Sequence, residues 1–482
     1  MATPSQLDRN DVQGIALHGY KHMDFAGFLL VQIESDASCR RWLGGRLSEV
    51  TTANAKAPHG CLNLAFTFLG LEKLRSVDAR WSGFSLEFIE GMVTPARQNL
   101  LGDHAGGPND PARWCWGGPG TPEIHLLVMM YASTEPTLTK WMDELTVEIE
   151  DHGMHVRQRL LSHPLREGRE HFGFHDGIAN PVVSASPAAA NDMAAGEFVL
   201  GYQNESGIFP PVPALVDAGS QIPWGRNGSY LVFRQISQDV NGFWGGLKQL
   251  VTQTQPRDPN SAVVRLGAKM MGRWPNGASL AVYSDAPPET TAKIAHGLDS
   301  FGYQHHDPDG SKCPFGSHVR RANPRDGMPP DAASSHAIVK RHRLLRRGRS
   351  YGLPVADFTG PEEARVNSKY PGSFPTPDRG LFFLALNADI KAQFEFVQQT
   401  WLNSRKFPDA YDSFDSIGGL PGRRDSQAVT SFVVPACPVR EHYTGVASFI
   451  RIVGGAYFFL PGMAALTCLA DTSLKPKPAS NR

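Results

Sequence analysis

Apolar, β-rich runs recur four times along the chain, and each stops at a small polar residue. Runs of this kind predict strands, and the apolar positions three or four residues apart that follow them predict helices. The expected strands are Phe28–Ser35, His125–Ser133, Tyr230–Ser237 and Leu381–Asn387. The expected helix caps that follow them are Asp36, Thr134, Asp239 and Asp389. The chain therefore carries an internal repeat of strand and helix units.

Two of these units lie before residue 200 and two lie after it. This arrangement predicts an α+β fold with two ferredoxin-like domains, each an antiparallel sheet with peripheral helices. The proline-punctuated stretch Phe209–Pro213 places the boundary near residue 215, so the expected domains are 1–215 and 216–482. The wider spacing of the second pair of units indicates inserts in the second domain, one of which holds Pro371, Pro375 and Pro377.

One long uncharged segment, Ile452–Ala470, has to be weighed as a membrane span. Its glycines and Pro461 favour a strand over Ala456–Leu460 that turns into a short apolar segment. The 47 basic and 47 acidic side chains cancel, which gives no overall field for nucleic acid or an anionic membrane. With no visible export signal and six widely spaced cysteines, we expect free thiols and a cytoplasmic location.

The most informative stretch is His171–Pro181, which places Asp176 between glycines and close to aromatic residues. An ordinary Asp-Gly turn is the competing interpretation. Against it, Phe172, Phe174 and Ile178 would surround the carboxylate with low-dielectric surface, which makes its pKa sensitive to neighbouring groups. The stretch is therefore a candidate site with an acid at its centre.

Two further segments carry candidate chemistry. His318 lies between Cys313 and Arg325 in a run that also contains two adjacent arginines. The nearby histidines and aspartates of 305–309 are better explained as a solvated turn than as a metal site, because adjacent histidines in a Pro-Gly loop do not readily face one ion. Residues 340–349 are strongly basic, which by itself indicates a solvated loop or a patch that binds polyanions.

Together these segments resemble the dye-decolorising peroxidases, in particular the larger members that carry inserts. The resemblance rests on Gly173 with Asp176-Gly-Ile-Ala-Asn-Pro181, on Cys313-Pro-Phe-Gly-Ser-His-Val-Arg-Arg-Ala-Asn-Pro-Arg325, and on the arginine run that ends at Tyr351-Gly352. It extends to Val12–Tyr20, Gly196–Tyr202, Gly228–Arg234 and Gln393–Gln398. It therefore covers most of residues 10–462.

The resemblance implies one haem b per chain, between the sheet and helices of the C-terminal domain near the domain interface. It implies that His318 binds the iron, that Asp176 shuttles a proton on the opposite side and that Arg346 assists it, with the register of the arginine run open by one residue. Arg343 falls where the family has a partner of a haem propionate. Other residues expected to contact the haem are Gly177, Ile178, Leu381 and Phe383.

Two questions about this site stay open at the level of sequence. If His318 binds the iron, a carboxylate or a carbonyl should fix the orientation of its ring, and Asp389 or Glu395 could serve. His175, next to Asp176, is a weaker candidate for proton transfer.

The implied function is a peroxidase that uses hydrogen peroxide to oxidise bulky aromatic dyes and phenolic compounds by one-electron steps through an oxoferryl intermediate. Such donors would react at surface Tyr or Trp residues. One alternative is a haem-binding or iron-releasing protein of the deferrochelatase kind with little peroxidase turnover. Another is a binder that uses only the basic run. The sequence leaves the oligomeric state open, a homo-oligomer included.

Overall fold

The structure of the chain is a computed structural model. It describes residues 6–165, 168–185, 187, 192–217, 220–254, 256–288, 298–354, 379–408, 410–411, 413–420, 431–436 and 438–473. The insert predicted around Pro371, Pro375 and Pro377 lies outside the described residues, as does Cys437. The other five cysteines are free thiols, as predicted.

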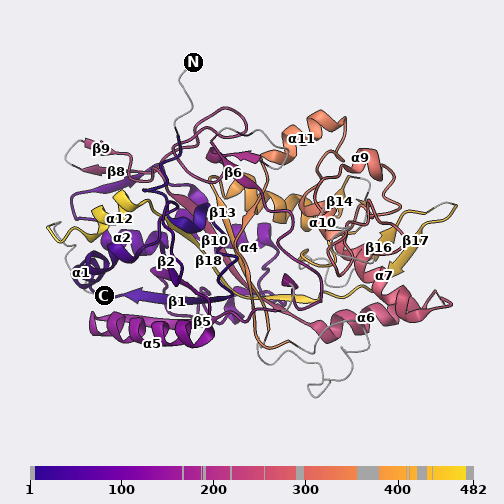
Figure 1. The fold of residues 1–482 in the computed structure, drawn as a ribbon, viewed down its shortest axis with the longest axis horizontal. Helices are drawn as coiled ribbons and strands as arrows, with labels where there is room; N and C mark the ends of the chain where they lie inside the picture. Colours follow the sequence, from indigo (N-terminus) through magenta and orange to yellow (C-terminus); the bar gives the residue numbers. More distant parts are fainter. Residues whose placement is uncertain are drawn as a thin grey trace.

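A nine-stranded antiparallel sheet forms the centre of the molecule (Figure 1). Its strand order is β11-β13-β10-β18-β2-β4-β1-β5, and β12 also pairs with β13. The bounds are β1 Phe25–Ile33, β2 Gly60–Phe66, β4 Leu126–Ala132, β5 Met154–Leu161, β10 Ser229–Gln238, β11 Leu345–Arg346, β12 Arg349–Tyr351, β13 Gly380–Asn387 and β18 Ile450–Leu460. All four predicted strands are therefore confirmed, as β1, β4, β10 and β13.

The first and second halves of the chain each supply one side of this sheet. β5, β1, β4 and β2 come from the first half, and β18, β10, β13, β12 and β11 come from the second. The two sides meet where Phe66 of β2 pairs with Phe459 of β18. The antiparallel α+β architecture agrees with the prediction, while the division at residue 215 stays a prediction.

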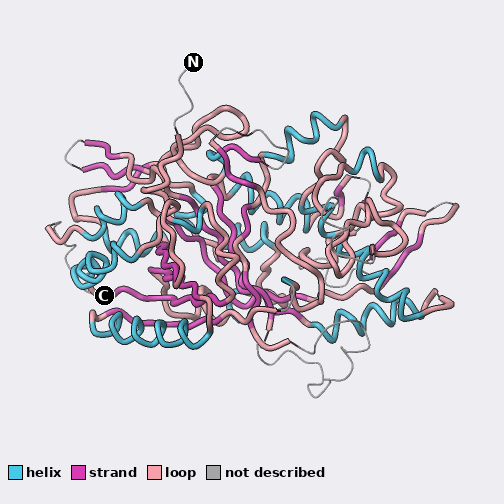
Figure 2. Tube along the Cα trace, viewed as in Figure 1, coloured by secondary structure: helices cyan, strands magenta, loops and turns pink. Residues whose placement is uncertain are grey.

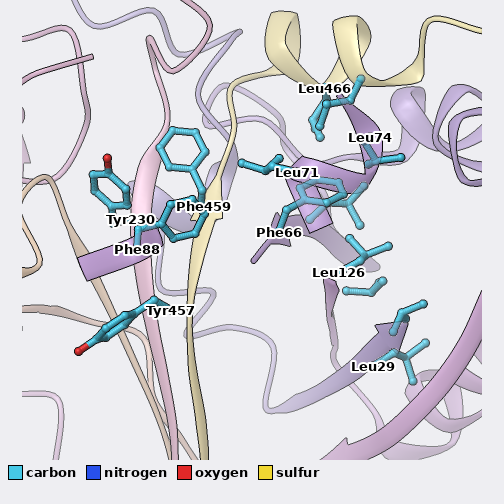
Figure 3. Close-up of a cluster of buried hydrophobic side chains, with 14 of the residues drawn as sticks. Leu29, Phe66, Leu71, Leu74, Phe88, Leu126, Tyr230, Tyr457, Phe459 and Leu466 are labelled. Carbon is cyan, nitrogen blue, oxygen red and sulfur yellow. The ribbon is translucent and has the colours of Figure 1, made fainter. Parts of the chain in front are cut away.

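Alternating side chains of the strands build a hydrophobic core on each face of the sheet. In β1, Leu29 and Val31 belong to one core, whereas Phe28 and Leu30 belong to the other, as the period of two in a strand requires. Figure 3 shows that Leu29, Phe66 and Leu126 lie in the same buried cluster as Tyr230 and Phe459. One core therefore draws on both halves of the chain.

Helices cover the sheet and form a separate layer beside it, with loops between them (Figure 2). Their bounds are α1 Asp36–Arg46, α2 Phe68–Leu74, α3 Leu86–Glu90, α4 Pro95–Leu101, α5 Glu135–Asp151, α6 Val240–Thr252, α7 Pro259–Met271, α9 Tyr303–His306, α10 His318–Ala322, α11 Ala332–Lys340 and α12 Met463–Ala470. Short strands form small additional sheets: β3 Arg80–Ser82 with β8 Ala214–Asp217 and β9 Ser220–Ile222, β6 Val182–Ser184 with β7 Asp192–Ala194, β14 Lys406–Phe407 with β15 Ala410–Tyr411, and β16 Ser431–Val434 with β17 Glu441–Thr444.

Side-chain caps start the helices that follow the predicted strands. Thr134 caps α5 and Asp239 caps α6, as predicted, and each accepts a backbone N–H of the first turn. The prediction of Asp36 as the cap of α1 is wrong, because Ser35 accepts the Ser38 N–H and Asp36 is the first helical residue. A carboxylate at that position still favours the helix start, since it lies near the positive end of the helix dipole.

The segment after β13 is helical but not an α-helix. Lys391–Glu395 and Val397–Leu402 form two consecutive π-helical stretches. Asp389 acts as the predicted cap, since its Oδ1 accepts the Ala392 N–H at 2.8 Å. The predicted strand over Ala456–Leu460 is part of β18, and the apolar residues after it form α12. Among the described residues, no helix is long and apolar enough to cross a membrane.

Candidate functional site

Asp176 lies in a loop that turns back on itself. Gly173 and Gly177 have φ of +93° and +75°, a backbone conformation that favours glycine. The Asp176 N–H donates to the Gly168 carbonyl at 3.0 Å, and the Asp176 Oδ1 accepts the Gly177 N–H at 2.6 Å. The glycines that the sequence places around the acid thus permit the turn that presents its carboxylate.

Arg346 is the arginine of the basic run that meets this carboxylate. Its Nη1 donates to Asp176 Oδ1 at 3.0 Å. In β11, Arg346 pairs with Ala385 of β13, which puts its side chain on the same face of the sheet as Leu381 and Phe383. The sequence left open by one residue which arginine of the run meets Asp176. In the structure, Arg346 makes this contact.

Two further contacts hold the Asp176 loop against the arginine run. The Arg346 backbone N–H donates to Asn180 Oδ1 at 3.1 Å. The Arg343 Nη2 donates to the Ala179 carbonyl at 2.8 Å. The Asn180 side chain therefore fixes the loop to the start of β11.

Two other arginines of the basic run, Arg347 and Arg349, bind internal backbone carbonyls, whereas Arg341 is exposed. Arg347 is buried and donates to the Ile15 and Ala16 carbonyls, and Arg349 donates to the Gly19 and Tyr20 carbonyls. Lys340 forms an ion pair with Glu205 at 3.4 Å. Because these side chains are engaged in internal contacts, the structure does not support a solvated polyanion patch over residues 340–349.

His318 is the first residue of α10, and buried arginines hold that helix in place. Arg321 donates to the carbonyls of Trp401, Ser404 and Ser413. Arg320 donates to Asp307 Oδ2 at 2.9 Å. The two arginines that follow His318 in the sequence are thus anchors. Asp307 itself is buried, so the prediction of a solvated turn is wrong at that residue.

Asp415 is the carboxylate that orients His318. The His318 Nδ1 donates to Asp415 Oδ2 at 2.9 Å, while Asp415 Oδ1 accepts the Ile417 and Gly418 N–H groups at 2.7 and 2.8 Å. Although burial raises the pKa of Asp415, its interaction with His318 and these N–H groups outweigh burial and keep the pKa below its ordinary value. An ionised acceptor places the imidazole proton on Nδ1 and leaves Nε2 able to bind a metal.

The prediction of Asp389 or Glu395 in this role is wrong. Asp389 caps the π-helical stretch, and Glu395 pairs with Arg97 at 2.7 Å and accepts from the Tyr457 hydroxyl at 2.9 Å. Asp415 is 97 residues from His318 in the sequence. Its local signal is the Gly-Gly pair that follows: a Cβ at Gly418 would lie 3.0 Å from His318 Cε1, so only glycine lets this loop approach the imidazole without a shift.

Asp176, Arg346 and His318 affect one another electrostatically. Burial raises the pKa of Asp176, but the Arg346 charge and the hydrogen bonds from Gly177 and Arg346 outweigh it and leave the pKa below its ordinary value. The His318 charge lowers the Asp176 pKa further, and Asp176 in turn raises the pKa of His318. Asp176 is therefore a carboxylate at neutral pH, near enough to the imidazole for their charges to interact.

These three side chains are partly exposed. They are 47%, 32% and 28% accessible for Asp176, Arg346 and His318. The His318 Nε2 makes no hydrogen bond to any residue that the structure describes.

The apolar residues expected at the site are also partly exposed. Leu381 and Phe383 are only partly buried, although their neighbours Phe382 and Leu384 in β13 are fully buried. A Cβ at Gly177 would meet no described atom within 4 Å, and Ile178 is also half-buried. β13 and the Asp176 loop therefore each present partly exposed apolar side chains near the candidate site.

Several arginines lie near Arg343. Arg273 and Arg325 both pair with Asp299, and Arg343 lies close enough for the Arg325 charge to lower its pKa. Burial and the charges of Arg325 and Arg346 lower the pKa of Arg343 to about 10, with Asp299 acting in the opposite direction. Arginine side chains are well suited to bind a carboxylate such as a haem propionate. An imidazole whose Nε2 accepts no hydrogen bond from a described residue, partly exposed apolar side chains and nearby arginines together fit a haem.

The chain is similar to dye-decolorising peroxidases along nearly all of its length. No family model matches it. It is 27% identical over 485 residues to Peroxidase 2 of Mycetinis scorodonius, covering 95% of this chain and 87% of that protein. It is 28% identical over 488 residues to a dye-decolorizing peroxidase of Exidia glandulosa, with 96% and 87% covered. A Deferrochelatase of Yersinia pestis matches only 61% of the chain and 41% of its own length, at 26% identity.

Solved structures agree with these sequence relatives. An ancestral D-type dye decolorizing peroxidase superimposes with a TM-score of 0.75 at 26% identity, covering 96% of this chain and 99% of that one. A decolorizing peroxidase from Auricularia auricula-judae gives a TM-score of 0.76 at 25% identity, with 97% and 100% covered. Both the sequence matches and the shared fold extend across the two halves of the chain. In sequence and in fold, the protein is therefore similar to the dye-decolorising peroxidases.

Proposed function

We propose that the site binds one haem b per chain between His318 and Asp176 and uses hydrogen peroxide to oxidise aromatic dyes and phenolic compounds. The observation that supports this most strongly is that two sets of residues lie close enough for their charges to interact. On one side, Asp415 orients an imidazole whose Nε2 makes no hydrogen bond to a described residue. On the other, a carboxylate is paired with a guanidinium. The first can hold iron and the second can move a proton and stabilise an anion.

His318 Nε2 would bind the iron, and Arg343 with its neighbouring arginines would hold a propionate. Leu381 and Phe383 of β13, with Gly177 and Ile178 of the loop, would contact the porphyrin. When bound, haem supplies the iron at which peroxide is cleaved and which then takes single electrons from donors. The Asp415 carboxylate keeps the imidazole oriented and increases its basicity as a ligand.

The carboxylate has one oxygen available for proton transfer. Asp176 Oδ1 already accepts from Gly177 and Arg346, whereas Oδ2 has no hydrogen bond from any described residue. Oδ2 would take the first proton of hydrogen peroxide and return it to the departing oxygen, which leaves as water. Arg346 would stabilise negative charge on that oxygen as the O–O bond breaks. Its attachment to the Asp176 loop keeps both groups in register.

An absorption spectrum tests the proposal. Protein reconstituted with haem should show a Soret band whose intensity corresponds to one haem per chain. The band should change when hydrogen peroxide is added. It should return when an anthraquinone dye is added, and the dye should be bleached. A haem-binding or iron-releasing protein would show the band but little bleaching of the dye. A binder that lacks haem would show no Soret band, and that result would refute the proposal.

The pKa of Asp176 leads to a prediction for acidic pH. Because the Arg346 charge and hydrogen bonds hold this pKa below the ordinary value of 3.8, the carboxylate stays ionised down to that pH. The rate of reaction with peroxide should therefore persist at pH 4 to 5 and decline only as pH falls through the lowered pKa. Arg346→Leu removes the cation, so the acidic limb should move to higher pH. Stopped-flow rates across pH measure the acidic limb in wild type and in Arg346→Leu. If the limb lies at the same pH in both proteins, Arg346 does not lower the pKa of Asp176.

A further inference from the structure

A second carboxylate, Glu170, lies at the centre of the loop that carries Asp176. It is only 8% exposed. Its Oε2 accepts the Phe172 N–H at 2.9 Å and its Oε1 accepts the Phe174 N–H at 3.0 Å. The Glu170 backbone closes the same loop, because its N–H donates to the Phe174 carbonyl at 2.9 Å and its carbonyl accepts the Gly173 N–H at 2.8 Å. One side chain thus satisfies two backbone donors within four residues.

The central strand β10 anchors this carboxylate from outside the loop. Gln238, at the end of β10, donates its Nε2 to Glu170 Oε2 at 2.7 Å. The aromatic side chains of the loop pack outward, with Phe172 stacked on Phe243 and Phe174 stacked on Trp244 of α6. The backbone between Glu170 and Asp176 is therefore held by a polar centre on one side and by aromatic packing on the other.

Glu170 also senses the charge of Asp176. Burial raises the pKa of Glu170 to about 7, the three hydrogen bonds act in the opposite direction, and the Asp176 carboxylate raises it further. Burying a carboxyl group costs free energy, which its hydrogen bonds offset. The burial of Glu170 therefore requires an explanation. None of the contacts of the Glu170 carboxylate places it in direct contact with the space in front of His318.

We infer that Glu170 is a positioning residue, which fixes the Phe172 and Phe174 backbone and through it sets the placement of the Asp176 carboxylate. This rests on the proposed role of Asp176. A displacement of about 1 Å in a group that transfers a proton can cost about 100-fold in rate, so two backbone hydrogen bonds in the same loop matter to the reaction. The inference separates two carboxylates by role: Asp176 meets the peroxide and Glu170 holds Asp176 in position.

The test compares Glu170→Gln with wild-type holoenzyme. The glutamine oxygen can accept one of the two loop N–H groups, while its amide group opposes the other. We expect unchanged haem content and a reaction with hydrogen peroxide that is slower by about 10- to 100-fold. Hydrogen exchange, measured by mass spectrometry or NMR, should be faster at the Phe172 and Phe174 amides. A wild-type rate in Glu170→Gln would overturn the inference.

A double variant distinguishes positioning from a general structural effect. If Glu170 acts through Asp176, then Glu170→Gln with Asp176→Asn should react no more slowly than Asp176→Asn alone. If the two losses multiply, Glu170 acts by another route and the inference fails. Should Asp176→Asn itself react like wild type, the proposed proton shuttle fails, whereas amide exchange still reports whether Glu170 orders the loop.

Glu197 provides a matched control. It is 5% exposed, burial raises its pKa to about 7, and its Oε1 accepts the Glu205 N–H at 2.9 Å, but it makes this contact away from the Asp176 loop. Glu197→Gln should keep the wild-type rate, and an equal loss there would refute a specific role for Glu170. If Glu170→Gln does not fold, Gln238→Leu carries the same comparison, because it removes the anchor from β10 and leaves the loop residues unchanged.

Discussion

Asp176→Asn is expected to slow the reaction with hydrogen peroxide by about 10²- to 10⁴-fold while haem stays bound. The amide has nearly the same shape as the carboxylate and its oxygen can still accept the Arg346 and Gly177 hydrogens. It cannot take a proton at neutral pH, so only the proton transfer is lost. Stopped-flow absorption of the Soret band against peroxide concentration measures the rate constant directly.

Asp389→Asn serves as the control for this substitution. Asp389 is exposed and its Oδ1 caps the π-helical stretch, a contact that asparagine can reproduce. Its rate should equal that of wild type. An Asp176→Asn variant that reacts with peroxide at the wild-type rate, with full haem content, would remove Asp176 from the mechanism.

His318→Ala is expected to abolish stable haem binding. The imidazole is oriented by Asp415, and its Nε2 makes no hydrogen bond to a described residue, so this nitrogen is available to bind iron. Its loss removes the axial bond and leaves the Asp415 carboxylate buried without its partner, which should also lower the midpoint of thermal unfolding. The ratio of Soret to protein absorbance after reconstitution and gel filtration measures haem content.

Added imidazole provides a rescue for this variant. A free imidazole can occupy the volume left by the side chain, and it should restore part of the Soret band if the defect is the missing ligand. His305→Ala changes an exposed histidine in α9 and should retain one haem per chain. Full occupancy in His318→Ala without added imidazole would assign the iron to another residue.

The sequence was sufficient to predict the elements that local physics dictates. The four strands are long apolar runs, and Thr134, Asp239 and Asp389 act as caps because each is a short polar side chain before a helical stretch. The Asp176 turn was recognisable because only glycines permit its backbone. These features depend on residues close together in the chain, so their pattern is visible before any tertiary structure is known.

Contacts between distant segments could not be predicted in the same way. Asp415 meets His318 across 97 residues, and nothing local distinguishes it from other acids except the glycines that follow. The π-helical stretches have no simple periodic signal, and the inward direction of Arg347 depends on carbonyls of Ile15 and Ala16. In each case the partner is supplied by tertiary packing.

The pairing of Phe66 with Phe459 has a consequence for any attempt to divide the protein. The hydrophobic core that contains these rings also contains Leu126 and Tyr230. Neither half of the chain therefore forms this core by itself. A fragment that ends near residue 215 would present aromatic and aliphatic side chains to water, together with an unpaired strand end, and such surfaces associate with one another. Separately produced halves should therefore aggregate, or should refold only together. This is expected even though each half contains two of the repeated strand and helix units.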